Sequence, residues 1–322
     1  MIVVTGGAGF IGSAMVWKLN EHGVDDILIV DELGTDDKWK NLVPRRYRDY
    51  LHKDVFIEQV RANKLDGVTG IIHLGACSAT TERDADYLME NNFRYTRDLA
   101  EWAAGRGIRF IYASSASTYG DGENGFGDED AKVAALRPLH MYGYSKQLFD
   151  LHALRTGLST QTVGIKFFNV FGPNEYHKGK MRSVPLIAFK QIVETGALNL
   201  FKSYRSDYAD GAQMRDFIYV KDCVNALWWL LNNKSVNGIF NLGTGTARTW
   251  NDLGHAVFAA MDRAPNIRYI EMPDALRDQY QYFTEAPMDK LRATGCPQPQ
   301  FTLETAVADY VRNYLARDRR CL

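Results

Sequence analysis

The chain has few cysteines, no long apolar run and almost no net charge. Its four cysteines, Cys77, Cys223, Cys296 and Cys321, stand at spacings that match neither a metal site nor a disulfide framework. We therefore expect free thiols in a reducing compartment and no metal centre. No stretch approaches the roughly 18 apolar residues of a membrane span, and no charged segment precedes an apolar run at the N-terminus. These absences predict a cytoplasmic protein without a membrane partner.

The charged residues are balanced and dispersed. The 322 residues include 38 basic and 39 acidic side chains, which give a formal net charge of −1. No basic block is present that would neutralise the phosphates of a nucleic acid. The length suits one large domain or two smaller ones with a full hydrophobic core. The composition therefore indicates an ordinary globular protein and favours no nucleic-acid partner.

Apolar runs alternate with segments of helical periodicity over roughly the first half of the chain. Short apolar, β-branched runs occur at 1–5, 26–32, 70–76, 108–115 and 161–170, and segments of helical character lie at 10–23, 85–105 and 144–157. Strands and helices that alternate over short connections are typical of a parallel sheet covered on both faces. We therefore predict an α/β fold with a doubly wound parallel sheet.

The regular alternation of strands and helices ends after residue 170. Loops lengthen, and the apolar runs at 197–201, 215–220, 238–243 and 267–272 stand apart from one another. We predict a dinucleotide-binding domain over 1–170 plus about 216–245. A smaller, mixed α/β substrate-binding domain then covers about 171–215 and 246–322.

A glycine-rich turn follows the first predicted strand. Residues 5–12 read TGGAGFIG, in which Gly6, Gly9 and Gly12 satisfy G-x-x-G-x-x-G and Gly7 gives the stricter G-x-G-x-x-G. Glycines at these places permit a tight turn, close approach of a diphosphate to the backbone, and close packing of helix on strand. The helix that begins near Phe10 would direct its free amides at the phosphates. Because the motif links a strand to a helix, it predicts a dinucleotide site.

The identity of the dinucleotide is open from local chemistry. Asp31 ends the next predicted strand, 19 residues after Gly12, where an acid usually accepts hydrogen bonds from a ribose 2′-hydroxyl and favours NAD. Glu32 adds negative charge beside it. Against this, Lys38 and Lys53 follow closely and have the charge to bind the 2′-phosphate of NADP.

A serine, a tyrosine and a lysine have the spacing of a proton-transfer site. Ser115 lies at the end of the predicted strand 108–115, at the edge where open α/β sheets bind ligands. Tyr142 and Lys146 are four residues apart and share one face of a helix. A nearby ammonium favours the phenolate and lowers a phenol pKa that starts near about 10. We predict that Tyr142 exchanges a proton with an alcohol while hydride moves between that carbon and a nicotinamide.

Seven segments in this order resemble the extended short-chain dehydrogenase/reductase family, the nucleotide-sugar epimerases and dehydratases. They are IVVTGGAGFIGS, HLGACSATTE, YASSASTYG, YGYSK, FFNVFGPNEYHKGKMRSV, RDFIYV and GIFNLGTG. Within the family they are most similar to the 6-epimerases of ADP-heptose. The resemblance implies a Rossmann-type fold, tightly bound NADP, a role in supplying heptose for the lipopolysaccharide core, and a homo-oligomer.

The resemblance also implies individual contacts. Besides Gly6, Gly9, Gly12, Asp31, Glu32, Lys38 and Lys53, cofactor contacts are implied at Phe10, Ile11, Leu74, Gly75, Ala76, Cys77, Ser78, Asn91, Lys146, Val170 and Lys178. Substrate contacts are implied at Ser115, Asn169, Lys180, Phe201, Arg215 and Tyr280. The chain departs from the family at Leu74, where an acid is usual, at Glu32, at Ile187, and in a longer loop over 203–214. These departures leave the cofactor preference and the exact sugar open.

Epimerisation at carbon 6 of a heptose calls for a second proton donor. That carbon bears a secondary alcohol with no adjacent carbonyl, so loss of a proton cannot invert it. Removal of hydride, rotation of the 6-keto sugar and return of hydride to the other face would invert it without net redox change. The resemblance implies that Lys178, between His177 and Lys180, is the second acid/base. Burial and neighbouring positive charge would lower its pKa toward neutrality.

Two other functions fit parts of the pattern. A UDP-hexose 4-epimerase uses one tyrosine and a rotating sugar, and would not need Lys178. A non-catalytic dinucleotide sensor would normally lack the tyrosine or the lysine, and this chain has both Tyr142 and Lys146. Competition between ADP and UDP for the site would separate the two epimerases.

Overall fold

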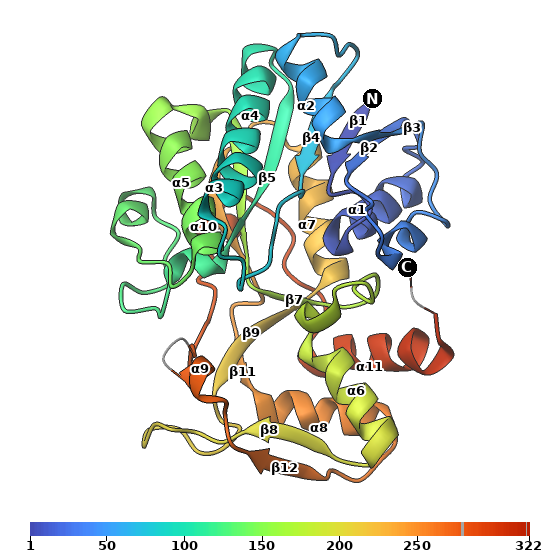
Figure 1. Ribbon diagram of the computed structural model, residues 1–322, viewed down its shortest axis with the longest axis vertical. Coiled ribbons are helices and arrows are strands. Elements are labelled where there is room, and N and C mark those ends of the chain that lie inside the picture. Colours follow the sequence, from blue (N-terminus) through green and yellow to red (C-terminus); the bar gives the residue numbers. More distant parts are fainter. Residues whose placement is uncertain (278–279, 320) are drawn as a thin grey trace.

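A seven-stranded parallel sheet forms the centre of the larger part of the molecule (Figure 1). The computed structural model describes residues 1–277, 280–319 and 321–322, with all their side chains except those of Lys180, Ala275 and Leu276. The strands run in the order β10-β6-β5-β4-β1-β2-β3, and every neighbouring pair is parallel. They are β1 (Ile2–Thr5), β2 (Ile27–Asp31), β3 (Asp49–His52), β4 (Gly70–His73), β5 (Arg109–Ser115), β6 (Thr162–Phe167) and β10 (Gly238–Leu242).

Helices cover both faces of this sheet, which confirms the doubly wound prediction. One face packs against α1 (Phe10–Glu21) and α7 (Val220–Asn232), and the other against α2 (Lys53–Arg61), α4 (Tyr95–Gly105) and α5 (Met141–Thr156). Successive strand residues serve opposite faces: Val4 belongs to the first hydrophobic cluster and Val3 to the second. Burial on both faces explains why these strands are continuous apolar runs rather than alternating ones.

The chain order reverses between β1 and β4, and this point locates the site. Strands β2 and β3 lie on one side of β1, whereas β4, β5, β6 and β10 lie on the other. In register, Thr5 pairs with Val30 on one side and with His73 on the other. The segments after β1, β2 and β4 therefore meet at one edge, the place where doubly wound sheets bind ligands.

The predicted helix over 85–105 is present but contains an irregular turn. It consists of α3 (Ala85–Leu88), the π-helical segment η2 (Met89–Arg94) and α4. Buried Asn92 in η2 accepts a hydrogen bond from the Cys77 amide at 2.9 Å and donates to the Cys77 carbonyl at 2.9 Å and to Ser145 Oγ at 3.1 Å. The irregular turn thus ties the segment after β4 to α5.

The smaller part contains two short sheets and several helices. One sheet joins β11 (Ala247–Thr249), β9 (Met214–Tyr219) and β7 (Asn169–Phe171), and the other joins β8 (Leu198–Phe201) to β12 (Ile267–Ile270). The helices are α6 (Val184–Thr195), α8 (Trp250–Ala260), α9 (Asp274–Arg277), α10 (Asp289–Arg292) and α11 (Leu303–Asn313). Short 3-10 helices occur at Asp37–Asn41, Ala116–Tyr119, Asp130–Ala135, Leu158–Thr160, Gly179–Met181 and Leu315–Arg317.

The prediction of one strand over 161–170 is wrong, because the chain leaves the large sheet at Phe168. The Phe168 amide bonds to the Leu242 carbonyl at 3.0 Å, and residues 169–171 then pair with β9. Phe167 and Phe168 are both buried, so the apolar pattern reaches the bend, and the exposed Asn169 follows it. Within 216–245, β10 joins the large sheet while β9 belongs to the small one.

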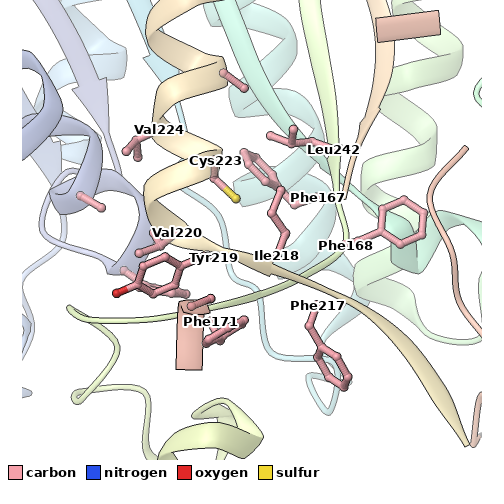
Figure 2. Packing of buried hydrophobic residues seen from close by; sticks show 14 of the residues in the cluster. Phe167, Phe168, Phe171, Phe217, Ile218, Tyr219, Val220, Cys223, Val224 and Leu242 are labelled. Carbon is pink, nitrogen blue, oxygen red and sulfur yellow. The ribbon is translucent and has the colours of Figure 1, made fainter. Parts of the chain in front are cut away.

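One hydrophobic cluster joins the two parts. Figure 2 shows Phe167 and Phe168, Ile218 of β9, Cys223 of α7 and Leu242 of β10 packed around the bend. The same cluster extends to buried residues of α6, α8 and α11. In the described part of the chain, no helix is long and apolar enough to cross a membrane.

Candidate active site

The glycine turn has the shape of a diphosphate cradle. Gly6 follows β1 with φ +64°, and Gly9 precedes α1 without a capping side chain, so the first amides of the helix remain available. A Cβ on Gly12 would stand 1.9 Å from the Gly6 carbonyl oxygen, and one on Gly6 would stand 2.7 Å from the Gly75 amide nitrogen. The backbone is therefore close-packed behind a helix N-terminus that faces the strand edge. The residues present fit a dinucleotide diphosphate.

Two lysines and two acids surround the far end of this cradle. Asp31 accepts hydrogen bonds from the amides of Ala8 (2.9 Å) and Glu32 (2.8 Å), and it forms an ion pair with Lys38 at 3.0 Å. Lys53 lies 3.4 Å from Glu32. All four residues line a cavity of about 330 Å³. Asn91 of η2 lines the same cavity.

Tyr142, Lys146 and Ser115 meet where β5 and α5 face the main cavity. Tyr142 and Ser115 line a cavity of about 740 Å³, and Lys146 is buried one turn further along α5. Burial lowers the pKa of Lys146 to about 8, with Asp150 acting in the opposite direction. Since that value stays above neutrality, Lys146 keeps its charge at pH 7.

The prediction that Lys146 lowers the pKa of Tyr142 is wrong for this structure. Burial is the largest effect and raises the pKa of Tyr142 above its ordinary value, while a hydrogen bond with Ser115 partly offsets it. Desolvation disfavours the charged phenolate more than the surroundings stabilise it. The protein alone therefore holds Tyr142 as a neutral phenol, ready to donate a proton.

A buried polar network joins α5 to strands β5 and β6. Lys166 of β6 and Asp150 of α5, both fully buried, form an ion pair at 2.7 Å. Asp150 also accepts hydrogen bonds from Ser114 (2.7 Å) and Tyr112 (3.0 Å), both on β5. Asp150 lies one turn after Lys146 and two after Tyr142, so the network fixes the turns that carry the tyrosine and lysine against the sheet.

Lys178 enters the same cavity from the loop after β7. Its Nζ lies 5.3 Å from the centre of the Phe10 ring, at the start of α1. Burial lowers the pKa of Lys178, as expected, but its other influence is the acid Glu175, which raises that pKa. Of the two cations predicted to help, the Lys180 side chain lies outside the described residues, and His177 does not act on the pKa of Lys178. His177 hydrogen-bonds to Asn41 at 3.4 Å, and burial lowers its pKa, which favours neutral imidazole.

The predicted substrate residues fall into two groups. Asn169 lines the main cavity and accepts a hydrogen bond from Thr284 at 3.4 Å. Arg215 and Tyr280 form a cluster with Trp250, which itself lines the cavity: the guanidinium lies 5.3 Å from the Tyr280 ring and 5.6 Å from the Trp250 ring. Phe201 meets Tyr280 edge to face at 6.5 Å. The side chain of Lys180 lies outside the described residues.

The cavities bring most of the predicted residues together. The main cavity is lined by Gly6, Gly9, Phe10, Ile11, Asp31, Lys38, Gly75, Ala76, Cys77, Ser78, Ser115, Tyr142, Asn169, Val170 and Lys178, and the smaller one adds Glu32, Lys53 and Asn91. Among the described residues, Gly12, Leu74, Lys146, Phe201, Arg215 and Tyr280 stand behind or beside these walls rather than in them. No group of three potential metal ligands occurs in the described part of the chain.

Several cavity residues escaped prediction. Ser117, Phe217 and Trp250 line the main cavity, and Asn41 bonds to the loop that carries Lys178. Ser117 belongs to the short helix directly after β5, a position that strand-edge reasoning identifies in principle. Trp250 and Asn41 carry no such local signal, because the folding of distant segments brings Trp250 to the cavity and Asn41 to the loop that carries Lys178.

Known proteins are similar to this chain in sequence and structure. A family model described as the NAD dependent epimerase/dehydratase family matches residues 2–243. The ADP-L-glycero-D-manno-heptose-6-epimerase of Nitratidesulfovibrio vulgaris (strain DP4) is 63% identical over 317 residues, covering 98% of each chain. The ADP-L-glycero-D-manno-heptose-6-epimerase of Fusobacterium nucleatum subsp. nucleatum is 49% identical over 328 residues and 99% of each chain.

A solved structure extends this similarity to the whole architecture. The crystal structure of Helicobacter pylori ADP-L-glycero-D-manno-heptose-6-epimerase has a TM-score of 0.80 to this chain at 26% identity. The match covers 97% of this chain and 95% of that one. The similarity therefore includes both the large sheet and the smaller part that bounds the cavity.

Proposed function

The chain belongs to the NAD dependent epimerase/dehydratase family, and we propose that it interconverts the two carbon-6 epimers of ADP-glycero-D-manno-heptose. Relatives of that name span almost its full length at 63% and 49% identity. The family uses a nicotinamide dinucleotide. The observation that carries the proposal is one cavity with two separate proton-transfer groups, Tyr142 on α5 and Lys178 on the loop after β7.

Two such groups suit inversion of a secondary alcohol. When bound, the nicotinamide supplies a hydride acceptor for carbon 6 and later the donor, so it ends each cycle unchanged. Oxidation removes hydride from carbon 6 and a proton from its hydroxyl, which leaves a 6-keto sugar. After the sugar turns, hydride returns to the other face and a proton returns to the oxygen. In our proposal Tyr142 and Lys178 each serve one orientation of that oxygen.

The neighbouring residues prepare these two groups. Lys146 stays cationic under Tyr142 and stabilises negative charge that develops on the phenol oxygen. Ser115, which hydrogen-bonds to Tyr142, can also bond to the sugar oxygen. Burial lowers the pKa of Lys178, so its neutral amine is reached more easily than that of a surface lysine.

We further propose that the cofactor is NADP and that Lys38 and Lys53 bind its 2′-phosphate. Both lysines line the cavity at the far end of the diphosphate cradle. Lys38 pairs with Asp31, and Lys53 pairs with Glu32 and Asp54, so each lysine can exchange a carboxylate for a phosphate. The other cavity-lining residues given above would hold the remainder of the dinucleotide. The nucleotide sugar would be contacted by Asn169, Lys180, Phe201, Arg215 and Tyr280. Two of the guanidinium donors of Arg215 bond to backbone carbonyls, and its other donors could bind a diphosphate oxygen.

The same proposal divides the chain by role. Residues 1–170 with about 216–245 bind the dinucleotide, and about 171–215 with 246–322 bind the sugar nucleotide. The product would supply heptose for the lipopolysaccharide core. We also propose a homo-oligomer, which light scattering of the purified protein would test directly.

The first experiment is incubation of the purified protein with ADP-D-glycero-D-manno-heptose without added cofactor. We expect a mixture of the two 6-epimers, separable by chromatography, because a retained dinucleotide suffices for a cycle without net redox change. No conversion even with added NADP or NAD would contradict the proposal. Conversion of UDP-hexoses instead would identify a 4-epimerase.

Replacement of Lys178 tests the second acid/base. We expect Lys178→Met to lower kcat by about 10²–10⁴-fold, the usual contribution of a general acid or base, and to leave the retained dinucleotide in place. Lys64→Met, at an exposed position, is the matched control. Near-normal turnover of Lys178→Met would exclude the two-group scheme.

The cofactor preference is measured separately. Mass spectrometry of the dinucleotide released on denaturation should identify NADP. Lys38→Met and Lys53→Met should each weaken NADP binding about 10–100-fold, as expected when one charge-assisted hydrogen bond is lost, with little change for NAD. Equal losses for both dinucleotides would place these lysines elsewhere than at the 2′-phosphate.

A further inference from the structure

One buried carboxylate closes the loop that carries Lys178. Glu175, only 1% exposed, accepts a hydrogen bond from the Gly172 amide (3.3 Å) at the start of the loop. It also accepts two from Ser183 at the end of the loop, from the amide at 2.6 Å and from Oγ at 2.5 Å. Tyr310 of α11 donates a fourth at 3.1 Å. The side chain therefore ties both ends of residues 172–183 to each other and to α11.

The hydrogen bonds around Glu175 favour its charged form. All four partners are positioned to donate, and two of them are backbone amides, which cannot accept. Burial raises the pKa of Glu175, whereas the bonds from Ser183 and the charge of Lys178 lower it. In return, Glu175 raises the pKa of Lys178 against the effect of burial. Each charge thus offsets part of the desolvation cost of the other.

The residue before Glu175 attaches the loop to the diphosphate cradle. Asn174 is fully buried in a left-handed conformation, with φ +78°. Its side chain donates to Ser13 Oγ of α1 at 2.9 Å, and its carbonyl accepts from Asn41 at 3.0 Å. Asn41 also donates to the Ala8 carbonyl, within the glycine turn, at 3.0 Å. The loop is therefore held in register with the start of α1, where the Lys178 ammonium lies over Phe10.

We propose that Glu175 is a positioning residue for Lys178: its buried carboxylate closes the 172–183 loop and sets the charge state in which Lys178 meets the sugar. The inference rests on the proposed role of Lys178 as the second acid/base. Glu175 lines neither cavity described above, so it acts through Lys178 and not by contact with substrate.

Removal of the carboxylate charge should make Lys178 easier to deprotonate. Glu175→Gln keeps the size of the side chain and loses its charge. The pKa of Lys178 should then fall, and the limb of the pH–rate profile that reports Lys178 should move to lower pH. The limb should move to lower pH whether Lys178 acts first as an acid or as a base. A merely structural role would lower stability or kcat without moving that limb.

The test is competitive amine labelling of the purified protein, with its retained dinucleotide, across a series of pH values. Mass spectrometry of peptides gives the labelling midpoint of Lys178, with exposed Lys64 in the same sample as the reference. In Glu175→Gln we expect a midpoint at least one pH unit lower, equal to a tenfold change in the acid dissociation constant. Glu194→Gln, the same change at an exposed position on α6, should leave the midpoint unchanged.

A second variant protects the test if Glu175→Gln does not fold. Glu175→Met removes the same charge with a side chain of similar length, so it should lower the Lys178 midpoint in the same direction. An unchanged or higher midpoint in a folded Glu175 variant overturns the proposal. The proposed role of Lys178 fails if Lys178→Met retains normal turnover. The two outcomes can be distinguished, because the labelling midpoint does not depend on catalysis.

Discussion

Burial acts in opposite directions on the two proton-transfer groups. It raises the pKa of the acid Tyr142 and lowers that of the base Lys178, because both charged forms lose solvation. At neutral pH the protein alone holds a protonated phenol and a lysine that gives up its proton more readily than usual. One group is therefore suited to donate a proton to a carbonyl oxygen and the other to accept one from a hydroxyl.

Replacement of Tyr142 separates catalysis from cofactor binding. We expect Tyr142→Phe to reduce the kcat of epimerisation by about 10²–10⁴-fold, because the ring and its packing remain while the proton donor is lost. The retained dinucleotide, measured after denaturation, should be unchanged. Tyr144→Phe is the matched control, since Tyr144 is 45% exposed and lies two residues away on α5. Turnover within about fivefold of normal in Tyr142→Phe would contradict a general acid/base role for this residue.

The junction of β1 and α1 is the element most tightly constrained by its residues. Its glycines are required by the space around them: a Cβ on Gly12 would overlap the Gly6 carbonyl group at 1.9 Å from the oxygen and 2.7 Å from the carbon. Neither neighbour is a flexible side chain, so α1 would have to move away from the strand. Any such movement displaces the amides at the start of α1 from the phosphates.

A substitution at Gly12 tests this packing. We expect Gly12→Ala to lose the retained dinucleotide and to lower the thermal midpoint, as backbone shifts of this kind typically cost about 1–3 kcal/mol. Gly105→Ala is the control: Gly105 ends α4 with nothing within 4 Å of an added Cβ, so this change should be neutral or slightly stabilising. Full dinucleotide content in Gly12→Ala would show that the turn tolerates displacement.

The two parts of the molecule share one core, so they should unfold together. A histidine buried in the large sheet makes the stability of the whole protein depend on pH. His73 is 1% exposed at the end of β4. Thr96 gives its proton to the Asn92 carbonyl, so His73 Nε2 donates to Thr96 Oγ1 (2.8 Å) and Nδ1 accepts from Thr5 (2.7 Å). Burial, aided by the charge of Lys146, lowers the pKa of His73 to about 3. The folded protein therefore requires neutral imidazole.

This requirement predicts a loss of stability in acid. The folded pKa lies below the unfolded value of about 6.5, so the His73 contribution is complete above about pH 6.5 and declines as pH falls toward the folded pKa. Each pH unit in that window should cost about 1.4 kcal/mol, measured by denaturant unfolding. His73→Asn should be less stable at pH 7.5 but lose less on acidification, whereas His255→Asn, at an exposed position, should follow the parent protein. Equal slopes for His73→Asn and the parent would contradict a neutral buried His73.

Local patterns identified most of the elements that form the large sheet. The apolar runs ending at Thr5, Asp31 and Ser115 became buried strands, and the glycines between β1 and α1 became the turn. The same patterns missed β3 and the bend at Phe168. β3 is a short strand at the edge of the sheet and has no fully buried residue, so it lacks an apolar run. At the bend, the chain exchanges one partner strand for another, and this change leaves no pattern in the sequence.

The residues themselves dictate the doubly wound sheet, the diphosphate cradle and the pairing of Tyr142 with Lys146, because these depend on spacings of a few residues. The folded chain alone decides that Glu175 stands behind Lys178, that Trp250 reaches the cavity, and that burial rather than Lys146 dominates the pKa of Tyr142. Desolvation and contacts across more than a hundred residues, such as Tyr310 to Glu175, arise only when distant segments meet.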